Sequence, residues 1–135
     1  MPEQTAFDYA VVRVVPRVDR DEFVNAGVII FAPQARFLAA RVHLDEERLR
    51  ALWPAVDLDQ VRRHLEAIPR IAAGDADAGP IASLSQSARF HWLTSPRSTV
   101  IQISPVRTGL SAEPETLLDH LTRELVLTEV GPPAA

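Results

Sequence analysis

The chain has 135 residues, 47% of them hydrophobic, and a formal net charge of −4 at pH 7, which fits one globular domain with its own core. It contains no cysteine, and all 14 Lys and Arg positions are arginine, so disulfides, thiolate metal ligands, a cysteine nucleophile and a Schiff-base lysine are excluded. The negative net charge disfavours strong non-specific nucleic-acid binding. No apolar run is long enough to span a bilayer. We expect a cytoplasmic protein.

Two β-forming runs open the chain, and a short charged segment joins them. The first run covers residues 7–15 and is expected to end at Pro16, which cannot donate to a ladder. The second run covers residues 23–31. The short connection RVDRDE between them predicts an antiparallel hairpin. Apolar residues fall on both faces of the first run, which is typical of a central strand.

A third strand and two helices are predicted for the middle of the chain. The strand covers residues 36–43. Asp45 suits a helix N-cap, followed by acids in the first turn, and this helix is expected to end at Trp53. A second helix is predicted over residues 57–71, because apolar residues recur there at spacings of three and four.

The C-terminal half is less regular. Residues 73–80 are predicted to form a surface loop, and residues 81–98 show no clear periodicity. Residues 99–104 predict a short strand closed by Pro105. Pro114 suits the first turn of a last helix, whose leucines share one face.

The predicted order is therefore β-β-β-α-α-β-α. We predict an α+β fold in which an antiparallel sheet, built from the hairpin, the third strand and a C-terminal strand, has its helices packed on one face. Residues 1–130 are expected to form a single domain, and residues 131–135 a disordered tail.

Three segments resemble an uncharacterised bacterial family, catalogued as domain of unknown function 3037. They are YAVVRVVPRVDRDEFVNAGVIIF, RALWPAVD, and STVIQISPVRTGL with the acidic-start helix that follows it. The hairpin carries the most specific pattern: an Arg in the first strand, a Pro that ends it, and then Glu-Phe-Val-Asn-x-Gly-Val. The resemblance implies no established activity, cofactor or catalytic residue. It implies a neighbourhood, since genes of the family often sit beside kinase-like proteins of the persistence-toxin type.

Polar residues interrupt the apolar hairpin and form the first candidate site. If Arg13 lies opposite or diagonal to Asn25, both stand on one face beside Gly27, which has no side chain. Such a polar dent suits a carboxylate, a phosphate or a peptide carbonyl. The alternative is a structural arginine, satisfied by carbonyls or by an acid such as Asp8 or Glu22, with the glycine serving a bulge or a close helix approach.

Cations and aromatic rings combine in a second candidate site, as they do in proteins that bind single-stranded nucleic acid. Its members are Arg89, Phe90, His91, Trp92, Arg97 and Arg107. The alternative is a loop whose aromatic rings plug the sheet and whose arginines face the acidic C-terminal helix.

Two further chemistries are weighed. The hairpin acids Asp19, Asp21 and Glu22 could hold Mg²⁺, but acids flanked by arginines are more often a solvated turn. The histidines lack metal-ligand spacing, so we expect no metal and no cofactor. A hydrolase could combine His91 with Ser95 or Ser98, although no nucleophile elbow is present.

We therefore interpret the chain as a small binding or regulatory module, and more as a binding protein than as an enzyme. It would act through contact with another protein, such as a kinase-like neighbour, or as a homo-oligomer. The alternatives are a nucleic-acid-associated protein or metal-dependent nuclease, and a small hydrolase. We expect no membrane contact.

Overall fold

The computed structural model describes residues 4–96 and 99–127. The predicted site residue Arg97, the candidate nucleophile Ser98 and the predicted tail 131–135 lie outside the described residues. The strands of the described part are β1 (Thr5–Arg17), β2 (Glu22–Ala32), β3 (Phe37–Val42), β4 (Ile101–Ile103) and β5 (Arg107–Ser111). Its α-helices are α1 (Glu46–Leu52), α2 (Leu58–Ala73), α3 (Gln86–Thr94) and α4 (Pro114–Leu125).

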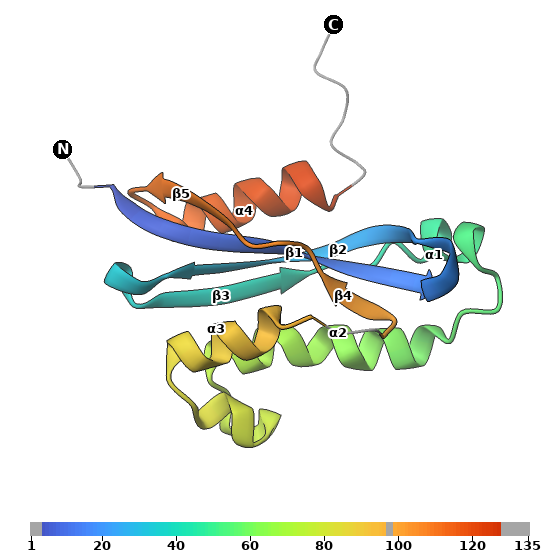
Figure 1. Cartoon of the computed structure of the whole chain (residues 1–135), viewed down its shortest axis with the longest axis horizontal. Coiled ribbons are helices and arrows are strands. Elements are labelled where there is room, and N and C mark those ends of the chain that lie inside the picture. The colour runs from blue at the N-terminus through green and yellow to red at the C-terminus, as the bar shows by residue number, and fades with distance from the viewer. Residues whose placement is uncertain (1–3, 97–98, 128–135) are drawn as a thin grey trace, which may run out of the picture.

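All strand pairs are antiparallel, in the order β3-β2-β1-β4, and β5 also pairs with β1. Strand β1 is central: β2 lies along one edge of it, and β4 and β5 follow each other along the other edge (Figure 1). The predicted α+β class and antiparallel sheet are confirmed. The hairpin is confirmed as well, since a short 3₁₀ turn, η1 (Val18–Arg20), joins β1 to β2.

The predicted packing of all helices on one face is wrong. One core cluster joins the sheet to α1, α2 and α3, through residues such as Leu49, Leu65 and Phe90. A second cluster joins the opposite face to α4, through residues such as Leu118. The sheet thus lies between two helical layers, with α4 on one side and α2 and α3 on the other (Figure 1). The central strands are apolar on both faces because both faces are covered.

A bulge in β2 decides which side chains share a face. Val12 pairs with Gly27, whereas Arg13 pairs with Asn25, so Ala26 is one extra residue on the β2 side. Such an insertion shifts the alternation of side chains along the bulged strand. Asn25 therefore points to the α4 side of the sheet together with Arg13, although Ala26 is buried in the cluster on the other side.

Three details of the prediction needed correction. Pro16 does not end β1, because a second register shift between Val14 and Arg17 accommodates the missing donor. Residues 81–98 contain α3, whose N-cap Ser85 accepts a hydrogen bond from the backbone N–H of Ala88. A strand, β5, follows Pro105, so the observed element order has one more helix and one more strand than predicted.

Ser104 explains how the chain continues past Pro105. Its hydroxyl accepts a hydrogen bond from the Val11 N–H at 2.8 Å and donates one to the Pro105 carbonyl at 3.1 Å. The buried side chain thereby satisfies the backbone of β1 at the point where β4 gives way to β5. A proline is tolerated here because the interrupted strand lies at the edge of the sheet.

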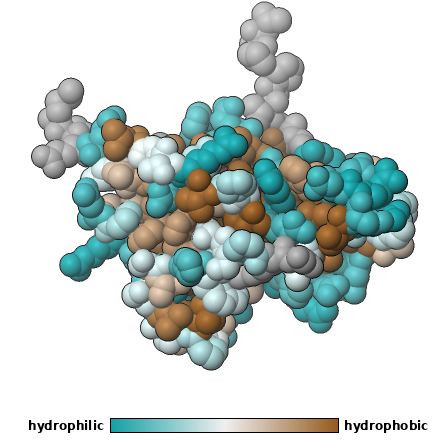
Figure 2. Space-filling view, in the orientation of Figure 1, coloured by the Kyte–Doolittle hydropathy of each residue, from teal (hydrophilic) through white to brown (hydrophobic). Residues whose placement is uncertain are grey.

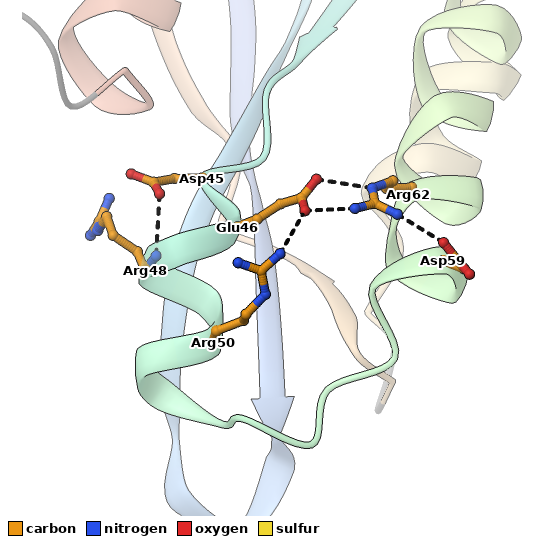
Figure 3. Close-up of polar contacts among 6 residues, drawn as sticks. All are labelled: Asp45, Glu46, Arg48, Arg50, Asp59 and Arg62. Atoms are coloured by element: carbon orange, nitrogen blue, oxygen red, sulfur yellow. Dashed lines mark hydrogen bonds and ion pairs between the residues drawn. The ribbon is translucent and has the colours of Figure 1, made fainter.

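The predicted helix starts at Asp45 and Asp57 are confirmed, since each side chain accepts a hydrogen bond from a first-turn backbone N–H. Arg62 of α2 then ties the two helices together. It donates to Glu46 at 2.6 and 2.9 Å and to Asp59 at 2.8 Å (Figure 3). Among the described residues, no helix is long and apolar enough to cross a membrane.

Candidate functional site

Arg13 and Asn25 come together as the hairpin pattern predicted. They are cross-strand partners in the β1–β2 ladder. The Asn25 amide donates a hydrogen bond at 3.0 Å to the carbonyl of Leu125, at the C-terminal end of α4. The two side chains therefore lie on the α4 face of the sheet, beside the end of that helix. We call Arg13 and Asn25 the polar pair.

Each member of the polar pair keeps an unsatisfied buried atom. Arg13 Nε and Asn25 Oδ1 are both buried and have no hydrogen-bond partner among the described residues. Buried polar atoms are rarely left without a partner, and each such atom costs about 1–3 kcal/mol. One donor and one acceptor on cross-strand neighbours are thus left unpaired below the surface, although each side chain as a whole is only half-buried.

The Arg13 guanidinium also has an aromatic support. Its Cζ lies 4.3 Å from the centroid of the Phe23 ring, and this ring is 40% exposed. A cation over an aromatic face is held in place without losing its donors. The arrangement fixes the direction of the guanidinium while leaving it able to bind an acceptor.

The acids considered as structural partners of Arg13 are placed elsewhere. Glu22 forms an ion pair with Arg20 at 2.5 Å. Asp8 pairs in the ladder with Phe31 on one side and Thr108 on the other, several residues before Arg13. No ion pair of the described residues includes Arg13, so its charge is not neutralised there.

Gly27 does not border the polar pair. A Cβ on Gly27 would lie 3.3 Å from the Cβ of Val12, which belongs to the cluster on the opposite face. It would also lie 2.7 Å from the Arg41 carbonyl oxygen of β3. The expectation that this glycine opens a dent beside Arg13 and Asn25 was wrong. The alternative of a close helix approach was wrong as well, because the close neighbour is strand β3, and the glycine directly follows the bulge at Ala26.

The basic aromatic segment does not form a single surface. Arg89 donates to the carbonyls of Leu84 and Ala72, so it holds the end of α2 rather than facing α4. Phe90 plugs the core, with its ring 5.2 Å from that of Phe31. The ion pair to the acidic C-terminal helix comes instead from Arg41 of β3, which contacts Asp119.

The remaining members of this candidate site are distributed over two elements. His91 and Trp92 are exposed on α3, which packs on the face opposite to α4. Arg107 is exposed at the start of β5 and pairs with Tyr9. Tyr9 packs in the α4-side cluster, so Arg107 shares a face with the polar pair and His91 does not.

The hairpin acids are mostly neutralised by arginines. Arg17 donates to both carboxylate oxygens of Asp19, at 2.6 and 3.2 Å, and this hydrogen bonding lowers the pKa of Asp19. Glu22 is paired with Arg20. No group of three or more potential metal ligands occurs within residues 4–96 and 99–127.

Ser95 and His91 do not meet as a nucleophile and its base would. The Ser95 hydroxyl donates at 2.7 Å to the backbone carbonyl of His91, as serines near a helix end often do. A triad would instead need the hydroxyl on the imidazole.

Two contributors to the polar pair were missed from the sequence. One is Phe23, whose position two residues before Asn25 placed it on the same face and could have indicated it. The other is the Leu125 carbonyl, which only the docking of α4 on the second face brings near.

The family model described as "Protein of unknown function (DUF3037)" matches residues 9–126. The chain therefore belongs to that family, as the resemblance of its hairpin indicated. The comparison with curated proteins finds no match, and neither does the comparison with solved structures.

Proposed function

We propose that this member of the DUF3037 family is a binding module, which contacts a protein partner through the polar pair and captures an acidic group of that partner on Arg13. The observation that carries the proposal is the pair of unsatisfied buried atoms, Arg13 Nε and Asn25 Oδ1, beside an exposed aromatic ring. A partner that satisfied both atoms would remove the cost of leaving them unpaired.

The chemistry of the pair defines what would fit. A guanidinium offers five donors in a planar fork, which matches a carboxylate through two parallel hydrogen bonds. The unpaired Asn25 oxygen is buried, so it would accept an N–H from the same partner once the side chain turns toward the surface. The ring of Phe23 would supply apolar contact next to these polar ones. Arginine and aromatic residues together are typical of the energetic centres of protein interfaces.

The surroundings favour a protein over a small ion. One exposed apolar side chain stands beside the polar pair: Phe23, which is 40% exposed and carries the Arg13 guanidinium over its ring. Hydrophobic patches are visible over the β4–β5 side of the molecule (Figure 2). Exposed apolar surface beside a polar centre is a common mark of interaction surfaces. The kinase-like proteins implied by the family resemblance are the first partners to test.

The test is a direct binding measurement by calorimetry between the purified chain and a kinase-like protein of the type that the family resemblance implies as a neighbour. We expect Arg13→Gln to weaken binding about tenfold or more, because a hydrogen bond to a charged group contributes about 1.5–3 kcal/mol. Arg123→Gln is the matched control, since Arg123 is an exposed arginine of α4. Thermal unfolding of each variant verifies that the fold is intact.

Two results would reject the proposal: no complex at micromolar concentration, or a complex that Arg13→Gln and Arg123→Gln weaken equally. Light scattering on the chain alone tests the homo-oligomer. If the unbound chain is dimeric and Arg13→Gln makes it monomeric, the partner that uses the polar pair is a second copy.

A further inference from the structure

A cavity of about 330 Å³ lies on the other side of the sheet from the polar pair, between α2, α3 and β4. Its floor is apolar and buried: Ile68 and Ile71 of α2 and Ile101 of β4 are 4–6% exposed. Trp92 of α3 forms a wall and is 38% exposed, so the indole reaches the cavity opening. The volume is within the range of small-molecule sites, which begins at about 300 Å³.

A guanidinium and an imidazole stand at this cavity. Arg63 and His64 line it from α2, and both are exposed. None of the described residues that line it is acidic, and Glu66, three residues after Arg63, is not among them. The acids Asp59 and Glu46 are engaged by Arg62, which is on a different side of the helix. The cavity therefore combines an apolar floor with positive charge at its mouth.

We propose that this cavity binds a small amphiphilic anion, a carboxylate carried on an apolar body. The apolar body would lie on Ile68, Ile71 and Ile101 and against the Trp92 ring, and the carboxylate would meet Arg63 at the mouth. A polyphosphate does not fit, because the walls offer few polar groups. A neutral apolar molecule would leave the charge of Arg63 unused, whereas a carboxylate matches the guanidinium fork.

Trp92 gives a direct readout. The chain has two tryptophans, and the other one, Trp53, is under the Arg17 guanidinium away from the cavity. In a Trp53→Phe background, the fluorescence of Trp92 reports occupancy. The probes are octanoate, octanol and octylamine, which share one apolar chain and differ in charge. We expect saturable binding with octanoate tightest, octanol weaker and octylamine weakest.

Variants separate the two halves of the site. Arg63→Gln should weaken octanoate binding roughly fivefold and leave octanol binding unchanged, because a partly exposed ion pair contributes about 1 kcal/mol. Ala67→Leu, which fills the cavity, should abolish the fluorescence change for both. Arg123→Gln, on α4, is the control and should bind like the parent. Circular dichroism verifies the fold of each variant.

The proposal is overturned if octanoate gives no saturable change, if octanol binds as tightly as octanoate, or if Arg63→Gln and Arg123→Gln behave alike. It does not depend on the polar pair. Loss of the protein complex in Arg13→Gln with octanoate binding retained would support two separate sites.

Discussion

Replacing Gly27 by alanine distinguishes an architectural glycine from one that opens a binding site. An added Cβ would lie 2.7 Å from the Arg41 carbonyl oxygen, 2.9 Å from Val42 Cγ1 and 3.3 Å from Val12 Cβ. Ordinary contacts begin near 3.4 Å, so the Arg41 carbonyl would have to retreat by about 0.7 Å. That carbonyl belongs to β3, which pairs with β2 at this position, so the strand as a whole must move.

Overpacking of this kind costs about 1–3 kcal/mol in a well-packed core. For a urea m-value of about 2 kcal/mol/M, the midpoint of unfolding should fall by roughly 0.5–1.5 M. Equilibrium urea unfolding, followed by circular dichroism, measures this shift. Binding of the partner at the polar pair should be unaffected under conditions where the variant is folded, because Gly27 lies on the other face of the sheet.

Gly109→Ala is the matched control. Its Cβ would also lie 2.7 Å from a neighbour, but that neighbour is Cζ at the tip of the Phe7 side chain, which a small change in χ1 moves without displacing a strand. Gly109 moreover lies in the edge strand β5, where the backbone has more room. We expect Gly109→Ala to be the milder of the two. If Gly27→Ala is as stable as the parent, or if Gly109→Ala is the more destabilising, the reasoning about the β2–β3 approach is wrong.

Two further predictions follow from single interactions. The Arg62 hydrogen bonds lower the pKa of Glu46, so the ion pair stabilises the fold near neutral pH, and this contribution is lost as the pH falls through the folded-state pKa. The melting temperature of Glu46→Gln should therefore lie below that of the parent at about pH 7 and approach it at about pH 3. A difference in melting temperature that stays constant with pH would contradict the pairing. Ser104→Ala should lower the free energy of unfolding by about 1–3 kcal/mol, because it leaves the Val11 N–H without its acceptor. Ser104→Thr keeps the hydroxyl and should recover part of this stability. An equal loss of stability in both variants would show that the hydrogen bond is not the cause.

The elements with regular patterns were predictable, and those held by long-range contacts were not. The helix start at Asp45 followed from local capping chemistry, and the one at Asp57 followed from the spacing of apolar residues in the helix after it. Strand β5 was missed because a proline such as Pro105 usually marks the end of a strand. The compensation comes from Ser104, whose hydroxyl bonds a strand 93 residues away in the chain. No local pattern contains that contact.

The position of α4 was missed for a related reason. Residues of β2 are buried on both faces, so their sequence does not alternate and cannot indicate which face a given helix covers. The bulge at Ala26 adds to this, because one extra residue reverses the alternation in a strand where both registers are apolar. Only the amphipathic pattern of α4 itself could indicate that this helix packs its apolar face against another surface.

The polar pair shows what a sequence can and cannot say about a site. That Arg13 could oppose Asn25 followed from strand geometry, and the ladder confirms it. Whether Arg13 forms an ion pair within the chain depends on whether Arg13 or another arginine pairs with the nearest acid. Glu22 was the nearest acid across the hairpin, but Arg20 is two residues from it and forms the ion pair. Because Glu22 is paired with Arg20, the Arg13 guanidinium lies over the Phe23 ring and forms no ion pair with a described acid. The unbalanced charge thus arises from how neighbouring residues are paired, and this is why we propose that a partner is recognised at Arg13 rather than along α3.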